Sequence, residues 1–251
     1  MSRNRLVSAA LAATVFLVGC SDPSGSASNR VAFQMATKTT AAVQATAAAQ
    51  AATLVGTTYF APNGDQITFE TVSIVLHKIE LGLTSAPVCD PAVAGDCEEL
   101  KAGPVTLNLP LGDGAQMEFV VDVPDGSYDK VEFKVAPDPA TGYSIHATGS
   151  YTPQGGSLSR FDFTSDLDAE QEHEFSAPIT IPDPSGGSAG VTLFVDLSKW
   201  FANGTGDGFV DPSTANHQPG TNEGLVKENI KNSLDAFEDE NHDGKDDHGV
   251  V

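Results

Sequence analysis

The segment QMEFVVDVPDGSYDKVEFKV, at residues 116–135, decides the fold class. Large apolar side chains recur at every second position on both sides of a central turn, namely Met117, Phe119, Val121 and Val123 before it and Val131, Phe133 and Val135 after it. A period of two is typical of a strand with one buried and one solvated face. The Pro-Asp-Gly sequence between the two runs supplies the turn. We therefore expect two neighbouring antiparallel strands here.

The same alternation extends over residues 54–197. Further strands are expected at 66–81, 105–109, 143–151, 158–164, 172–181 and 191–195. No segment of helical period separates them, so the sequence predicts an all-β fold, an antiparallel β-sandwich. Within 66–81 the apolar positions change parity between Leu76 and Ile79. This change predicts a β-bulge or a crossing between sheets.

The N-terminus has the layout of an export signal. Arg3 and Arg5 precede a short apolar run at 6–18, which ends in Leu17-Val18-Gly19-Cys20. This tetrapeptide resembles the bacterial lipobox. The resemblance implies that Cys20 carries a diacylglycerol group and becomes the first residue of a protein anchored to a membrane by its N-terminal lipid. Ser21 follows the cysteine, and by resemblance to Gram-negative sorting this implies the outer membrane.

The two other cysteines are Cys89 and Cys97. In an oxidising compartment an even number of thiols favours a disulfide, which would stabilise the fold by about 2–3 kcal/mol. A metal or redox site is the alternative, but the segment has neither a C-x-x-C motif nor a histidine nearby.

The chain is expected to have four regions. They are the signal peptide at 1–19, a lipidated N-terminus and Ala/Thr-rich linker at 20–53, the sandwich at 54–197 and a short helical appendix at 198–251. Within the linker region, 30–36 alternates and predicts a first edge strand. Within the appendix, Val226, Ile230, Leu234 and Phe237 recur at helical spacing, which predicts a helix from 221 to about 238.

The C-terminal sequence DENHDGKDD, at residues 239–247, has the spacing of a calcium loop. Oxygen-bearing side chains at loop positions 1, 3 and 5 converge on one point, a glycine at position 6 permits the sharp turn, and position 7 offers a carbonyl. The pattern resembles the front of EF-hand, thrombospondin type 3 and dockerin-like repeats, with Asp239, Asn241, Asp243, Lys245 and Asp247 as ligands. Position 12 is Val250 where an EF-hand has glutamate, so we expect weak binding, about 10⁻⁴–10⁻³ M. A solvated acidic tail is the alternative.

A second loop, NGTGDGFVD at 203–211, repeats this frame with fewer carboxylates. Its candidate calcium ligands are Asn203, Thr205, Asp207, Phe209 and Asp211. A glycine-rich turn capped by aspartates accounts for the same sequence equally well.

The segment Val121-Asp-Val-Pro-Asp-Gly-Ser-Tyr-Asp-Lys-Val131 resembles a V-P-x-G-x-Y-x-x-I hairpin found in bacterial surface and periplasmic β-sandwich proteins, among them the methanobactin-periplasmic-protein-like group. The resemblance implies a fold and a class of protein, and it transfers no catalytic residue.

Composition narrows the function. The net charge of −21 argues against nucleic acid and anionic lipid surfaces as partners. The chain has no G-x-S-x-G, H-E-x-x-H, P-loop or dinucleotide-binding motif, so we expect no enzyme. The sequence favours a lipid-anchored envelope binding or scaffold protein with calcium-stabilised loops, whose partner is an envelope protein or a glycan.

Two alternatives stay open. A periplasmic copper- or zinc-handling protein would require His146, His173 or His217 to converge in the fold. A carbohydrate-binding or adhesive module would require an exposed aromatic platform, for which the chain offers one Trp and four Tyr.

Overall fold

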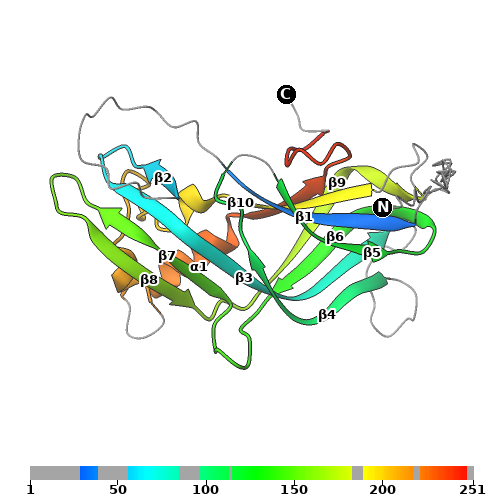
Figure 1. Ribbon diagram of the computed structural model, residues 1–251, viewed down its shortest axis with the longest axis horizontal. Coiled ribbons are helices and arrows are strands. Elements are labelled where there is room, and N and C mark those ends of the chain that lie inside the picture. The colour runs from blue at the N-terminus through cyan, green and yellow to red at the C-terminus, as the bar shows by residue number, and fades with distance from the viewer. Residues whose placement is uncertain are drawn as a thin grey trace, which may run out of the picture.

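The computed structural model describes residues 29–38, 56–84, 97–112, 115–182, 189–216 and 221–247. Its strands are β1 (Arg30–Thr37), β2 (Thr57–Phe60), β3 (Gln66–Leu83), β4 (Cys97–Asn108), β5 (Ala115–Asp122), β6 (Gly126–Val135), β7 (Ile145–Thr152), β8 (Ser159–Ser165), β9 (Ala169–Ile181), β10 (Ala189–Val195) and β11 (Leu234–Glu238). Two 3-10 helices, η1 (Leu197–Lys199) and η2 (Pro212–Thr214), and one α-helix, α1 (Glu223–Lys231), complete the described elements (Figure 1).

The strands form two sheets, which confirms the predicted all-β sandwich. One sheet has four strands in the order β11-β10-β1-β5, and the other has seven, in the order β8-β7-β3-β6-β9 with β2 and β4 also paired to β3. Every strand pair is antiparallel except β1 with β10, which run parallel. The core lies between the sheets and is filled by their inward side chains.

The seven-stranded sheet is organised around β3, a strand of 18 residues. Its first half pairs with β2 and β7, and its second half pairs with β4 and β6. The register shifts between Leu76 and Lys78 on both sides of the strand, so His77 is a bulge residue. The bulge lets Leu76 and Ile79 both enter the core. The predicted parity change is therefore confirmed as a bulge.

Tyr128 closes the turn between β5 and β6. Tyr128 is fully buried, and its hydroxyl donates a hydrogen bond of 3.0 Å to the carbonyl oxygen of Pro124. Gly126 lies under this ring, and a Cβ there would come within 2.9 Å of Leu83 and 3.4 Å of the Tyr128 ring. The Pro-x-Gly-x-Tyr spacing thus places a buried aromatic ring over its own turn, a use of tyrosine common in β-sandwiches.

The first strand lies in the interior of its sheet and not at the edge. β1 pairs with β10 on one side and with β5 on the other. All residues of β1 after Arg30 are buried. The sequence pattern shows which residues form the strand, but its neighbours come from positions far away in the chain.

The C-terminal helix is shorter than the spacing of apolar residues suggests. Helix α1 ends at Lys231, and Leu234–Glu238 form β11, which pairs with β10. Val226 and Ile230 are the buried helical positions, whereas Leu234 and Ala236 alternate inward from a strand. The expectation of a helix to 238 is wrong because the free edge of β10 offers backbone partners, and such tertiary pairing overrides local helical preference.

The two sheets approach each other where β9 lies beside β11. His173 Nδ1 and Asp235 Oδ1 are 3.0 Å apart, and the N–H of Ala177 donates to Glu238 Oε1 at 3.0 Å. The His173 ring also stacks on Phe133. Side chains, and not a ladder of backbone bonds, therefore connect the sheets along this side.

Candidate functional site

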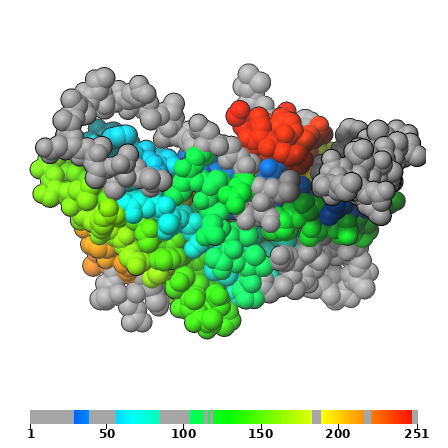
Figure 2. Space-filling view, in the orientation of Figure 1, coloured from blue at the N-terminus to red at the C-terminus, as the bar shows by residue number. Residues whose placement is uncertain are grey.

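The C-terminal loop 239–247 is fixed to the outer side of the four-stranded sheet. Directly after β11, the N–H of Asp239 donates to the carbonyl oxygen of Gly190 at 3.1 Å. The Asp239 side chain is fully buried and accepts a hydrogen bond of 2.7 Å from Thr192 Oγ1. Figure 2 shows these C-terminal residues, in red, as a compact mass on the surface of the molecule. The described part of the acidic segment is thus an ordered loop.

Inside the loop, Asp239 holds the turn. Its Oδ1 accepts the N–H of Asp243 at 3.0 Å, and its Oδ2 accepts the N–H of Gly244 at 2.8 Å. Gly244 has a φ of 79°, which a glycine adopts without strain. The residues at expected loop positions 1, 5 and 6 are therefore brought together as the spacing predicts.

His242 attaches the C-terminal loop to the four-stranded sheet. It has a φ of 60°, and its Nδ1 lies 2.7 Å from Nε2 of Gln34, which is buried in β1. Because the amide nitrogen is a donor, Nδ1 accepts. Gly190 in β10 lies beneath the loop, where a Cβ would overlap the carbonyl oxygen of Asp239 and approach His242 Cε1 to 2.8 Å. The loop therefore lies directly on the backbone of β10.

The side chains at positions 1, 3, 5 and 9 keep free acceptor capacity after their internal hydrogen bonds. A carboxylate oxygen accepts two hydrogen bonds. Asp239 Oδ1 accepts one, Asn241 Oδ1 accepts one from the Asp243 N–H, and Asp243 Oδ1 accepts one from the Lys245 N–H. Asp247 Oδ1 accepts from Asn241 Nδ2, at 2.6 Å. The donor set thus suits a hard cation such as calcium.

These groups do not form a closed cluster. Asp247 Oδ2 accepts the N–H groups of Glu240 and Asn241, and Lys245 Nζ lies 3.5 Å from Asp243 Oδ2. Among the residues that the structure describes, no three His, Cys, Asp or Glu side chains are grouped as a metal site.

The second loop, at 203–211, closes on itself. Asn203 Oδ1 accepts the N–H groups of Thr205 and Gly206, and Asn203 Nδ2 donates to Asp207 Oδ1 at 2.9 Å. Thr205 Oγ1 also donates to Asp207 Oδ1, at 2.5 Å, and these bonds hold the pKa of Asp207 below its ordinary value. Asp211 instead accepts the N–H of Ser213 and caps η2. An amide and a hydroxyl therefore occupy the acceptor that a cation would use.

Asp65 is the residue that this region depends on and that sequence reasoning missed. It is buried in the turn between β2 and β3, and its Oδ1 accepts the N–H of Gln154 at 2.8 Å. Its Oδ2 accepts the N–H of Phe209 at 3.0 Å and the side-chain amide of Asn63 at 2.8 Å. One carboxylate thus joins three turns. Pro62-Asn-Gly-Asp65 is recognisable as a turn, but nothing in the sequence indicates these distant partners.

The histidines of the transition-metal alternative are separated. His146 on β7 bonds Asp162 at 2.8 Å, whereas His173 on β9 bonds Asp235. Two strands, β3 and β6, lie between β7 and β9, which at about 4.8 Å per strand places the two backbones ~14 Å apart. His217 lies outside the described residues, as do Cys20 and Cys89 and the side chain of Cys97.

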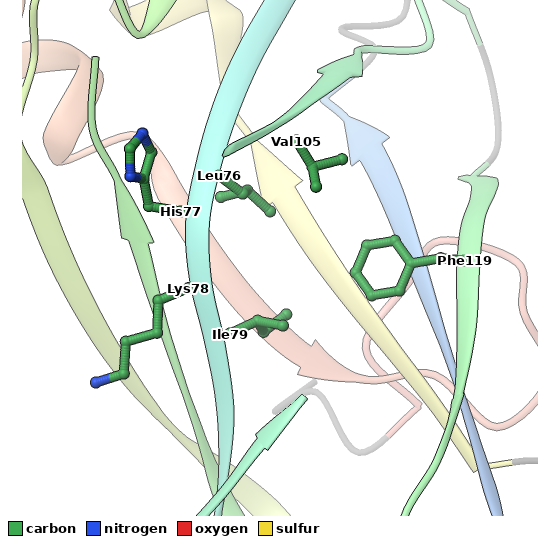
Figure 3. Close-up of a pocket in the computed structure, with 6 residues that line it drawn as sticks. All are labelled: Leu76, His77, Lys78, Ile79, Val105 and Phe119. Atoms are coloured by element: carbon green, nitrogen blue, oxygen red, sulfur yellow. The ribbon is translucent and has the colours of Figure 1, made fainter. Parts of the chain in front are cut away.

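A small apolar pocket lies at the bulge of β3 (Figure 3). Leu76, Ile79, Val105 and Phe119 point toward one another, and His77 and Lys78 point to the other side of the strand. Its volume of about 10 Å³ holds at most one water molecule. The pocket is thus a packing gap beside the bulge and not a ligand cavity.

The aromatic side chains are mostly internal. Trp200, Tyr59 and Tyr128 are fully buried, and Tyr151 is nearly so. In the described ranges, the large hydrophobic side chains that are exposed are Phe60 and Leu158. This part of the chain therefore has no aromatic platform of the kind that sugar-binding modules use.

No helix in the part of the chain that the structure describes is long and apolar enough to cross a membrane. Comparisons of the chain with protein-family models, with curated proteins and with solved structures found no match.

The lowered pKa of Asp65 predicts that the stability of the protein depends on pH. Burial raises the pKa of this carboxyl, but the hydrogen bonds from Asn63, Gln154 and Phe209 hold the pKa below its ordinary value. Its stabilising contribution is therefore complete above about pH 4, the unfolded pKa, and is lost as the pH falls through the folded pKa. We expect Asp65→Asn to lower the free energy of unfolding at pH 7 by about 1–3 kcal/mol and to flatten its fall below pH 4, measured by urea denaturation.

Asp122→Asn serves as the matched control, because this side chain is 88% exposed. We expect it to change stability by less than about 0.5 kcal/mol. If the free energy of unfolding of Asp65→Asn falls below pH 4 as steeply as that of the parent, the Asp65 carboxylate does not join the turns.

The close packing of the C-terminal loop on Gly190 predicts that a single added methyl group there destabilises the protein. Gly190→Ala places a Cβ against Asp239 and His242, so the loop must move and the protein should lose about 1–3 kcal/mol. Hydrogen exchange of the amides of 239–247 should accelerate. Gly204→Ala, where a Cβ meets no atom within 4 Å, should leave exchange in this loop unchanged. Equal hydrogen-exchange rates of the 239–247 amides in both variants would contradict the packing of this loop on Gly190.

Proposed function

We propose that this protein is a lipid-anchored, non-catalytic binding or scaffold protein of the bacterial outer membrane, with a C-terminal loop stabilised by calcium. The observation that carries the calcium part is the buried carboxylate of Asp239, which is positioned by Thr192 Oγ1 and by the N–H groups of Asp243 and Gly244. A carboxylate fixed by three donors presents its remaining lone pair in one direction. This loop therefore bears the closest likeness to a cation site among the described residues.

Calcium would supply positive charge beside the carboxylates of Asp239, Asp243 and Asp247, whose oxygens keep acceptor capacity. Asp239, Asn241, Asp243 and Asp247 would contribute side-chain oxygens and Lys245 its carbonyl oxygen. Lys245 Nζ, whose side chain is 80% exposed, now lies nearest Asp243 and is free to move into solvent. The 203–211 loop is the weaker candidate, because its own amide and hydroxyl groups already bind Asp207.

The anchoring part of the proposal is supported by the lipobox-like Leu17-Val18-Gly19-Cys20 sequence and by the strand that begins ten residues later, at Arg30. A Cys89–Cys97 disulfide belongs to the same proposal, since both residues would lie in an oxidising compartment.

Calcium binding is tested by two variants that remove the same charge. A ligand that binds only the native state stabilises it by RT ln(1 + [Ca²⁺]/Kd), about 1.4 kcal/mol at ten times Kd. At about 10 mM calcium, which is at least ten times the expected Kd, we expect the parent Tm to rise by about 4 °C or more. Asp243→Ala should abolish this rise.

Glu240→Ala should keep the rise, because Glu240 lies off the ligand register and only its backbone N–H is used, on Asp247. Loss of the calcium effect in both variants would indicate a diffuse acidic surface. A parent protein without any rise at millimolar calcium would refute the site.

Lipidation is tested at Cys20. Cys20→Ser should leave the precursor unprocessed and abolish partitioning of the protein into detergent, as measured by phase separation and intact mass. Detergent partitioning equal to that of the parent would refute the lipid anchor.

A further inference from the structure

The sandwich has two distinct ends. At the first, which we call the anchor end, the N–H of Val123 donates to the carbonyl oxygen of Asn29 at 2.8 Å, and Arg30 pairs with Asp122 at 3.5 Å. At the second, the far end, the Asn63 N–H donates to the Asp207 carbonyl oxygen at 2.8 Å. Figure 1 shows β2 and the β7–β8 hairpin at one end of the longest axis, while the blue strand β1 extends toward the other end.

Strand β3 runs from the far end to the anchor end, so its length gives the distance between them. It leaves the far-end turn at Gln66 and reaches the anchor end at Leu83, after which the Thr84 N–H donates to Ser127. Eighteen residues at about 3.3 Å each span up to ~60 Å, less a few ångströms at the bulges.

The chain between the lipid and the first strand is much shorter than this. From Cys20 to Asn29 are ten residues, which reach at most ~35 Å when fully extended. The anchor end is therefore confined near the bilayer surface. The far end comes near the bilayer only if the sandwich lies flat or is strongly tilted.

Charge opposes the flat arrangement. The chain carries a net charge of −21, and lying flat would bring its acidic surface within a Debye length, ~10 Å, of lipid phosphates. Standing on one end keeps most of this charge beyond that distance.

We propose that the sandwich stands on the membrane with its anchor end toward the lipid headgroups and its far end directed away. The turns that Asp65 joins, at 61–65, 153–158 and 203–209, then face away from the bilayer. This inference rests on the lipidation of Cys20 in the proposed function.

Energy transfer to a membrane dye tests the orientation. The lipidated full chain, with Cys89→Ser and Cys97→Ser, is placed in vesicles of phosphatidylethanolamine and phosphatidylglycerol that contain an acceptor-labelled lipid. A donor dye is attached either at Asp122→Cys, where the side chain is 88% exposed, or at Gly204→Cys, where a Cβ meets no atom within 4 Å. We expect transfer from position 122 to be about threefold or more above that from position 204, since the ends are ~60 Å apart.

Vesicle flotation separates the two ways of failing. Protein that floats with equal transfer from both positions lies flat, and protein with greater transfer from 204 stands inverted; either result overturns the orientation and leaves the anchor intact. Protein that does not float overturns the lipid anchor and the orientation together.

Discussion

The continuity of β3 through its bulge at His77 is the constraint on which the seven-stranded sheet depends. Four strands pair with this single strand, two along each half. Because side chains alternate along a strand, a shift of one residue moves every later side chain to the opposite face. The bulge at His77 makes that shift in step with the sequence, so that Val72, Ile74 and Leu76 before it and Ile79 and Leu81 after it all face the core. An earlier register shift, between Phe69 and Thr71, does the same for Phe69 and Val72.

Buried carboxylates attach the irregular segments to this framework. Asp65 joins three turns, Asp239 holds the C-terminal loop, and Asp196 accepts hydrogen bonds from the Ser198 N–H and from Lys38. All three are at least 95% buried. Each therefore replaces its lost hydration with N–H and hydroxyl donors or with a charged partner. Some of the acidic side chains of this chain thus accept hydrogen bonds from backbone N–H groups that lie outside the strands.

Local patterns predict only what local forces determine. Alternation located most of the strands and the bulge of β3, because burial of one sheet face imposes a period of two on the sequence itself. It missed β2 and the first half of β4. It failed at Leu234–Glu238, where apolar spacing fits both a helix and a strand and the free edge of β10 decided the outcome. The turn geometry of 239–247 followed from the positions of Asp239, Asp243 and Gly244. Its seat on Gln34 and Gly190 did not follow, because these residues are distant in the chain and carry no motif.

The parallel pairing of β1 with β10 has a consequence for how the molecule folds. Val31 is paired with Ala189, roughly 160 residues later, and contacts of such high sequence separation form slowly. β1 is synthesised early and has to wait for most of the chain before its pairing with β10 can form. Until then this apolar strand lacks one of its two neighbours, and an unpaired apolar strand is prone to aggregate.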